Sequence, residues 1–293
     1  MKKLFIILIV VFPYIGLTYA QNTSTISTTG DNNTTTVTQT GSNNASIEQI
    51  TDNSDATQTQ NGSGNTADID QKGGYPAGST TNNESAYQYQ LGSNNEATLW
   101  QLADVGDGDN IGNQYQNGAG NEVVAWQHTK GSEVDQDQIG NSNNAYSYQV
   151  GWFNYAKQYQ QGYRNAAWID EQKGGWVTGD YAYQYQLGND NTAMLQQYGS
   201  TIGTYGDNNW AKQQQTGNRN WAGEGFGGGP HETGLLQMGN DNTGTQIQNG
   251  NDNWVKLLQA GDNNYSYQNQ VGNSHTSTVS QTGDNNVSNV NQN

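Results

Sequence analysis

The chain has 293 residues, of which only 31% are hydrophobic, and its 10 basic and 26 acidic side chains give a net formal charge of −16. An ordinary globular enzyme would draw close to half of its residues from apolar types, and nucleic-acid binding requires a basic surface, so the composition disfavours both classes. The 18 Tyr and 8 Trp argue against simple disorder, whereas 41 Asn and 34 Gln make the chain prone to β-stacking.

The first 20 residues have the order of a secretory signal. Lys2 and Lys3 precede an apolar run over residues 4–12, and the segment ends in small residues before Gln21. The apolar run is too short for a membrane span, although an uncleaved anchor is the alternative. We therefore expect residues 1–20 to be removed, the mature chain to lack a membrane span, and the protein to be secreted or held at the cell surface. No Cys is present to staple the exported fold.

An 11-residue repeat occupies most of the remaining sequence. Residues 90–101 read Q-x-G-x-x-N-x-A-x-x-x-Q, and the closing Gln of one unit also opens the next. In the last part of the chain the Gln residues recur every 11 positions without a break, from Gln237 to Gln292. Self-similarity at a fixed period indicates a repeat architecture.

Alternate places of the repeat carry the structural information, because side chains two apart in a strand share a face. With the first Gln as place one, places six, eight, ten and twelve hold Asn, a small residue, an aliphatic residue or Gln, and Gln. Places seven, nine and eleven vary freely, as in Glu96, Thr98 and Trp100. Places two to five are rich in Gly and Asn, which accept positive φ readily. Each unit is thus predicted to be a short strand with one specified face, followed by a tight turn.

We expect an all-β fold in which two units form a coil of about 22 residues and the coils stack into an amyloid-like β-solenoid. Stacking at about 4.8 Å places each Gln above a Gln and each Asn above an Asn, so that their amides can donate and accept along the stack. Buried amides left unsatisfied would each cost roughly 1–3 kcal/mol. The predicted ladder residues are Gln60, Asn65, Gln71, Gln90, Asn95, Gln101, Gln116, Asn121, Gln127, Gln138, Asn143, Gln149, Asn154, Gln160, Gln186, Asn191, Gln197, Gln237, Asn242, Gln248, Asn253, Gln259, Asn264, Gln270, Gln281, Asn286 and Gln292. The predicted turn glycines are Gly62, Gly92, Gly118, Gly140, Gly151, Gly162, Gly188, Gly217, Gly239, Gly250, Gly261, Gly272 and Gly283.

The repeat frame is interrupted in several places. One residue is missing between Gln39 and Gln49, and insertions are predicted at residues 72–89, 102–115, 173–185 and 198–203. Residues 221–236 replace the repeat but keep its phase, which predicts a looped-out coil. We divide the chain into a signal (1–20), N-terminal repeats (21–71), repeats with insertions (72–236) and uninterrupted C-terminal repeats (237–293). Insertions in a solenoid usually emerge on its surface.

The repeat resembles the curlin repeat, S-x5-Q-x-G-x2-N-x-A-x3-Q, and the chain is similar to curli-type functional amyloid subunits. Residues 54–60 and 132–138 keep the Ser-x5-Gln opening, whereas residues 253–259 have Asn in place of Ser, so the two halves of a coil are expected to look alike. The resemblance implies export through an outer-membrane pore, a nucleator subunit, and growth of a homopolymer into adhesive biofilm fibres. The roles of major subunit and nucleator both stay open.

No enzyme chemistry is predicted, because the sequence has no clustered carboxylate pair or nucleophile. The three histidines, His128, His231 and His275, lack the spacing of metal ligands. The acidic turns lack the repeated Gly-Gly-x-Gly-x-Asp motif of calcium-binding β-rolls. We therefore predict no catalytic, cofactor or metal site. The alternative function is a soluble β-solenoid adhesin or an ice- or glycan-binding protein, although the outward places are too mixed for regular Thr rows. The outward aromatics are interpreted as cross-strand contacts worth roughly 0.2–1 kcal/mol each; these are Trp100, Trp126, Tyr148, Tyr159 and Trp168.

Overall fold

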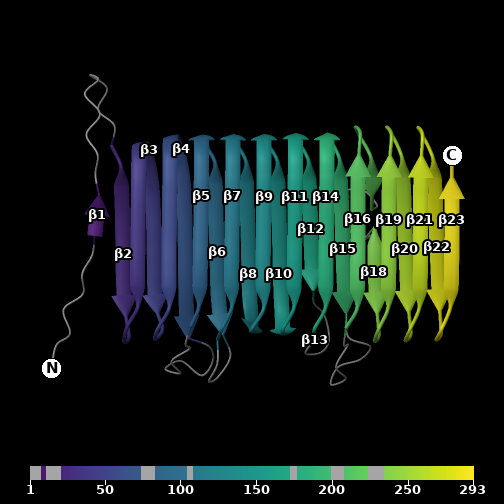
Figure 1. Cartoon of the computed structure of the whole chain (residues 1–293), viewed down its shortest axis with the longest axis horizontal. Coiled ribbons are helices and arrows are strands. Elements are labelled where there is room, and N and C mark those ends of the chain that lie inside the picture. Colours follow the sequence, from purple (N-terminus) through teal and green to yellow (C-terminus); the bar gives the residue numbers. More distant parts are fainter. Residues whose placement is uncertain are drawn as a thin grey trace, which may run out of the picture.

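The computed structural model describes residues 8–10, 21–73, 83–103, 108–171, 177–198, 208–223 and 234–293. These residues form strands and turns, without a helix among them, wound into about ten coils that stack along one axis. Figure 1 shows the strands side by side, with the N- and C-terminal coils at opposite ends of the stack. The predicted all-β solenoid with about 22 residues per coil is confirmed.

Each coil contributes one strand to each of two facing sheets. What we call the Gln sheet consists of β1 (Leu8–Val10), the first halves of β3 (Thr34–Ile50) and β4 (Asp55–Gly73), β5 (Ser85–Ser93), β7 (Ile111–Ala119), β9 (Glu133–Asn141), β11 (Tyr155–Tyr163), β14 (Tyr181–Asn189), β16 (Trp210–Thr216), β19 (Thr243–Asn249), β21 (Tyr265–Val271) and β23 (Val287–Gln292). What we call the aliphatic sheet consists of β2 (Thr23–Thr29), the second halves of β3 and β4, β6 (Glu96–Ala103), β8 (Glu122–Lys130), β10 (Asn144–Trp152), β12 (Ala166–Glu171), β13 (Val177–Thr178), β15 (Thr192–Tyr198), β17 (Trp221–Ala222), β18 (Leu235–Met238), β20 (Trp254–Ala260) and β22 (Thr276–Thr282).

Successive coils pair in parallel and in register. Gln116, Gln138 and Gln160 lie opposite one another in β7, β9 and β11, 22 residues apart. Where the sequence contains an insertion the step lengthens, to 30 residues between Gln60 and Gln90, but the pairing is kept. The residue missing from the repeat frame is absorbed by a register shift between Ser42 and Asn44 of β3.

Burial alternates along the strands as the repeat predicts. Around β6, Ala97, Leu99 and Gln101 are fully buried, whereas Glu96 is exposed and Trp100 is half-buried. The face that the sequence specifies is therefore the inner face of the coil.

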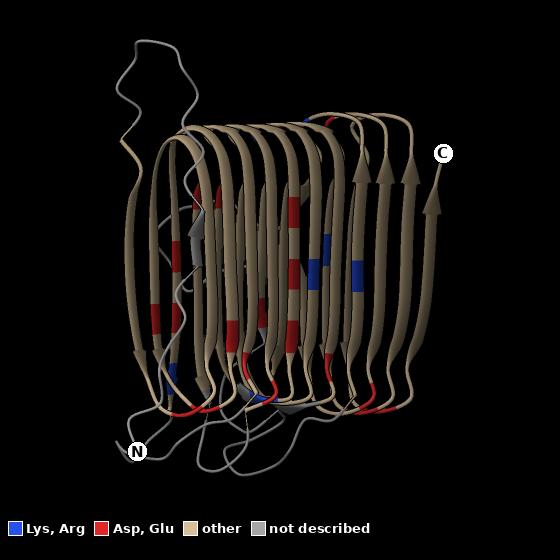
Figure 2. Cartoon of the chain, turned by 60° about the vertical axis from the view of Figure 1, so that its left-hand side comes forward, with Lys and Arg blue, Asp and Glu red and all other residues tan. Residues whose placement is uncertain are grey.

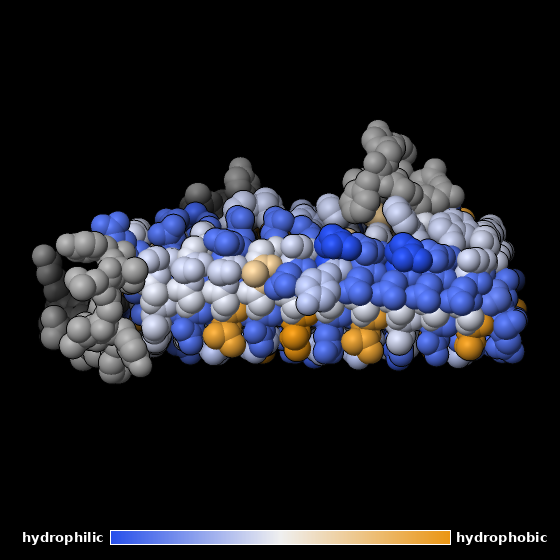
Figure 3. Space-filling model, turned by 90° about the horizontal axis from the view of Figure 1, so that it is seen from above, coloured by the Kyte–Doolittle hydropathy of each residue, from blue (hydrophilic) through white to orange (hydrophobic). Residues whose placement is uncertain are grey.

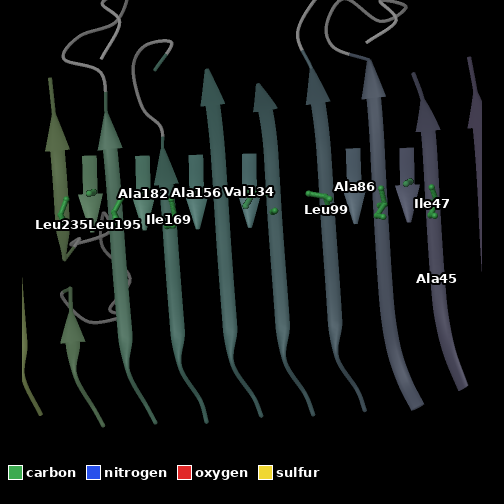
Figure 4. Packing of buried hydrophobic residues seen from close by; sticks show 14 of the residues in the cluster. Ala45, Ile47, Ala86, Leu99, Val134, Ala156, Ile169, Ala182, Leu195 and Leu235 are labelled. Carbon is green, nitrogen blue, oxygen red and sulfur yellow. The ribbon is translucent and has the colours of Figure 1, made fainter. Parts of the chain in front are cut away.

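The hydrophobic core is a column of large side chains from the aliphatic sheet, packed on small side chains of the Gln sheet (Figure 4). The large side chains are Ile47, Ile69, Leu99, Ile169, Leu195, Leu235 and Leu257, and the small ones include Ala56, Ala86, Ala156, Ala182 and Ala211. A Cβ atom added to Gly112 of the Gln sheet would lie 2.5 Å from Leu99 Cδ2. The small residue at place eight thus lets the two sheets approach closely.

The insertions are shorter than predicted. Residues 85–89, 111–115 and 181–185 belong to β5, β7 and β14, because sequences such as Ala86-Tyr87-Gln88-Tyr89-Gln90 are themselves half of a repeat unit. The remaining segments 74–82, 104–107, 172–176 and 199–207 lie outside the described residues. Segments 74–82, 104–107 and 199–207 each follow a strand of the aliphatic sheet and precede one of the Gln sheet, at the edge that we call the insertion edge. Segment 172–176 instead lies between β12 and β13 of the aliphatic sheet, and β14 of the Gln sheet follows β13 at the same edge.

The prediction of a looped-out coil at residues 221–236 is wrong. β17 and β18 pair with the same two strands, β15 and β20, and together replace one strand of the aliphatic sheet. Ala222 and Leu235 occupy successive inward places, which lie two residues apart in other coils and 13 apart here. The 11 extra residues equal one repeat period, which explains why the sequence spacing kept its phase. Residues 224–233 lie outside the described residues.

Candidate functional site: side-chain ladders and solenoid ends

Two Gln ladders run along the interior of the Gln sheet. In the first, each Nε2 donates to the Oε1 of the next coil through ten consecutive hydrogen bonds of 2.8–3.1 Å; its members are Gln39, Gln60, Gln90, Gln116, Gln138, Gln160, Gln186, Gln215, Gln248, Gln270 and Gln292. The second has eight such bonds; its members are Gln58, Gln88, Gln114, Gln136, Gln158, Gln184, Gln213, Gln246 and Gln268.

Each ladder amide also makes a bond across the core. Gln90 Nε2 donates to the Thr66 carbonyl at 2.9 Å, and Gln116 Nε2 donates to the Glu96 carbonyl at 2.8 Å. One amide hydrogen therefore joins neighbouring coils and the other joins the two sheets. This double use satisfies an amide that is fully buried, as at Gln90.

The aliphatic sheet has one Gln ladder, and it is interrupted. The first run joins Gln49, Gln71, Gln101, Gln127 and Gln149, and the second joins Gln197, Gln237, Gln259 and Gln281, with bonds of 2.8–3.1 Å. Between the runs Glu171 lies opposite Gln149. No donor reaches the Oε1 of Gln197, the first residue of the second run.

Asn columns line the two edges of the coil and donate in the opposite direction. Asn95 donates through both its backbone N–H and Nδ2 to Asn65 Oδ1 of the preceding coil, at 3.0 and 3.1 Å. Asn95 Nδ2 also donates to the Gly118 carbonyl of the following coil at 3.0 Å. Asn143, Asn165 and Asn191 repeat this pattern. The Asn side chain thus ties three successive coils together at each turn.

Most of the turn glycines have no room for a side chain. All the predicted turn glycines have φ between +92° and +140°, a range that L-residues rarely adopt. A Cβ atom at Gly62 would lie 1.7 Å from the Gly92 carbonyl oxygen of the next coil. The stacking of the turns, as well as their conformation, therefore requires glycine.

The structure places every predicted ladder residue in one of these columns, and it shows members that the sequence analysis missed. The complete second ladder of the Gln sheet was missed; its signal is the Gln-x-Gln pair, as in Gln58 and Gln60. Glu84 and Asp180 were also missed, and they occupy Asn places of the insertion edge. A residue there needs only a side-chain oxygen that accepts the next coil's backbone N–H, as Asp180 Oδ1 does from Asn209 at 2.8 Å.

Glu84 brings a carboxyl group into the buried edge column. It is 1% exposed and accepts from the backbone N–H and the Nδ2 of Asn110, both at 3.2 Å. Burial raises the pKa of Glu84 to about 8, against the lowering effect of the two Asn110 hydrogen bonds. The column therefore contains one group that titrates far above the ordinary range of a carboxyl.

Most charged residues of the described part are not buried, unlike Glu84 and Asp180, and Figure 2 shows where they fall along the strands and turns. At the edge opposite the insertions, Arg164 pairs with Asp190 and Arg219 with Asp252, both with Nε–Oδ1 distances of 2.6 Å. The Arg164 guanidinium holds the pKa of Asp190 below its ordinary value, chiefly through this hydrogen bond. Figure 3 shows this edge from above, with hydrophilic residues along it.

The two ends of the stack present complementary hydrogen-bonding groups. At the C-terminal end, Gln292 Nε2 donates to the Thr276 carbonyl, but no further coil offers it an Oε1 acceptor. At the N-terminal end, Gln39 is the first residue of the first Gln ladder. The other two ladders begin one strand further in, at Gln49 and Gln58, opposite Thr28 and Val37. The first Gln ladder thus has an amide donor at the C-terminal end and an amide acceptor at the N-terminal end.

Residues 250–283, which include β20 and β21, match the family model for the curlin associated repeat. The comparison with curated proteins finds no match. Among the described residues, no helix is long and apolar enough to cross a membrane. The ladders and turn glycines of the matched segment continue through the coils that precede it, so the chain is a curlin-repeat protein with a β-solenoid fold.

Proposed function

We propose that the chain is a secreted, non-catalytic subunit that polymerises end to end into curli-like amyloid fibres of an adhesive extracellular matrix. The observation that carries the proposal is the likeness of the two terminal coils. Residues 276–292 and 23–39 have the same residue at 11 of 17 aligned positions, including the run Thr-Gly-Asp-Asn-Asn at the turn. The last coil of one copy can therefore be followed by the first coil of another with the first Gln ladder and the Asn column of the insertion edge continued.

The hydrogen-bonding directions favour one polarity of stacking. In a head-to-tail junction Gln292 Nε2 meets Gln39 Oε1 of the next copy, and the Asn33 amide meets Asn286 Oδ1, as inside the chain. A tail-to-tail junction would place amide donors against donors. Parallel strands with unpaired edges are templates for such growth.

The N-terminal segment bears on the timing of assembly. β1 pairs with β3 through Leu8–Thr36 and the two following residue pairs, so it occupies the edge that β23 of another copy would use. Removal of residues 1–20 on export would open this edge. Export through an outer-membrane pore and a nucleator subunit at the cell surface fit the same scheme.

Fibre growth with and without a blocked end tests the proposal. The backbone N–H groups of Trp254 and Tyr265 donate to the following coil, at His275 and Asn286. By the same pattern those of Thr276 and Val287 point to the next copy. Proline at both positions removes these donors without removing a bond inside the chain.

We expect chain 21–293 to form fibres with a spacing of about 4.7–4.8 Å along the axis. The double variant Thr276→Pro/Val287→Pro should form short species that fail to elongate seeds, and the chain with residues 1–20 should start more slowly. Elongation by the proline variant at the normal rate would contradict end-to-end stacking at this edge.

A further inference from the structure

Three pairs of tyrosine rings stack on the outer face of the Gln sheet. The ring centroids of Tyr89 and Tyr115 are 5.3 Å apart with an interplanar angle of 9°. Tyr155 and Tyr181 stack at 4.9 Å and 6°, and Tyr159 and Tyr185 at 5.0 Å and 7°. The members of each pair lie directly opposite in adjacent strands, so the register of the solenoid fixes the stacking.

These rings are held in place but accessible to solvent. All six are half-buried on the outward face, and the Tyr159 hydroxyl donates to Gln161 Oε1 at 3.0 Å, which orients its ring. Two phenols that are parallel, close and partly exposed have the arrangement needed for coupling between neighbouring rings, because the entropy of bringing them together is already lost.

We propose that the three pairs are sites of oxidative dityrosine cross-linking by hydrogen peroxide with a peroxidase. Each phenol gives up one electron and one proton to form a tyrosyl radical. The two radicals join through a carbon–carbon bond between ring carbons ortho to the oxygens, and the proton on each of these carbons then moves to the ring's oxygen, which restores both hydroxyls and the aromaticity of the rings. The balance is two Tyr plus one H2O2 giving one dityrosine plus two H2O.

The links would staple adjacent coils within one chain. Each joins residues 26 positions apart, so it closes a loop of one coil and restrains the unfolded chain. Cross-linked solenoids should resist unwinding in strong denaturant. The inference needs the folded solenoid but does not rest on the proposed fibre function, because both rings of a pair belong to the same molecule.

Other tyrosines of the same sheet provide internal controls. Tyr183 lies between Lys157 and Lys212 in register, and Lys212 Nζ is 5.6 Å from its ring centroid. Tyr267 lies between Thr245 and Asn289. Neither lies opposite another tyrosine, so the geometry predicts that both stay uncoupled inside one chain.

Peptide mass mapping after treatment with peroxidase and H2O2 tests the inference, with equal amounts of ¹⁵N-labelled and unlabelled full-length chain mixed before assembly. We expect cross-linked peptides that have lost two hydrogen atoms and join Tyr89–Tyr115, Tyr155–Tyr181 and Tyr159–Tyr185. Each should carry a single label state, as a link within one chain does. Their yield should fall at least several-fold when the chain is unfolded in urea first.

The variant Tyr181→Phe/Tyr185→Phe should lose two of the three links, while the matched variant Tyr183→Phe/Tyr267→Phe should lose none. The inference is overturned if Tyr183 or Tyr267 couples as often as the stacked pairs, if links of mixed label dominate, or if unfolding leaves the pattern unchanged. A chain that stays monomeric yet gives the three links would refute the fibre proposal and keep this one.

Discussion

The Gln sheet and the aliphatic sheet enclose the same core but hold their coils together differently. The Gln sheet has two unbroken amide ladders, whereas the aliphatic sheet has one Gln ladder with a break at Glu171 and one column of hydrocarbon side chains. The split strand β17–β18 also falls in the aliphatic sheet. Hydrocarbon contacts are non-directional and tolerate such defects, whereas an amide ladder requires a partner at every step.

Because their side-chain columns differ, the two sheets contribute differently to the stability of the solenoid. The aliphatic column excludes water, and the Gln ladders fix which residue of one coil lies above which residue of the next. A shift by one residue would turn every ladder amide to the outer face. The Gln sheet is therefore the part of the molecule that specifies register.

The largest effect is expected from removing ladder amides as a set. The variant Gln248→Ala/Gln259→Ala/Gln270→Ala breaks ladders in both sheets and leaves several buried amides without partners, each worth roughly 1–3 kcal/mol. We expect assembly to slow by orders of magnitude, as measured by a dye-binding time course. The outward control Lys256→Ala/Tyr267→Ala/Thr278→Ala should change it only slightly. Equal kinetics for the two variants would contradict the assignment of the faces.

A single substitution in each sheet sharpens the comparison. Gln158→Leu removes the partner of Gln136 Nε2 and of Gln184 Oε1, so it should destabilise the solenoid by roughly 2 kcal/mol or more. Ile169→Leu in the aliphatic sheet conserves volume and should cost under about 1.5 kcal/mol. Guanidinium midpoints measure both, and a larger loss for Ile169→Leu would remove the distinction between the sheets.

The buried carboxyl of Glu84 predicts a pH dependence. Its pKa in the folded chain, about 8, lies above the ordinary value of 4.5, so the folded state holds the proton more tightly. The contribution of Glu84 to the free energy of unfolding is therefore fully present below pH 4.5, where the group is protonated, and is lost as the pH rises through 8. Glu84→Gln should leave stability at pH 4 unchanged and raise it at pH 9 by roughly 1–3 kcal/mol. Denaturation at the two pH values measures this, and a variant that gains equally at both would exclude Glu84 as the cause.

The smallest effect concerns the acidic turns at the ends. Asp31 donates its backbone N–H to Asp52 Oδ1, and Asp262 donates to Asp284 Oδ1 at 2.9 Å. A head-to-tail junction would place these four carboxylates in one column, without the Arg partners present at Asp190 and Asp252. Salt should therefore speed elongation a few-fold by screening. Asp284→Asn should reduce that dependence, and an unchanged salt response would show that the junction does not gather these charges.

Much of this architecture can be predicted from the sequence because the same residue pattern recurs in many repeat units. Inward Asn95, Leu99 and Gln101 alternate with variable residues, and a period of two admits only one assignment of faces. The difference between the sheets was not predicted, because place ten alternates between Leu or Ile and Gln in successive units and was read as one mixed place. The place of Glu84 in the Asn column was not predicted because the residue follows an insertion, so no preceding Gln or Gly showed which place of the repeat it occupies. The split at Ala222 was hidden because the inserted length equals the period.

The continuity of the Gln ladder from one copy to the next is the most direct test of the account. Fibres grown from a mixture of two preparations, one labelled with ¹⁵N at the Gln292 side chain and one with ¹³C at the Gln39 side-chain carbonyl, allow solid-state NMR to measure that contact. The account predicts a contact between copies at hydrogen-bond distance, about 2.9 Å from Nε2 to Oε1. Fibres in which Gln292 instead approaches Gln292 of another copy, or in which no Gln39 contact is found, would contradict it.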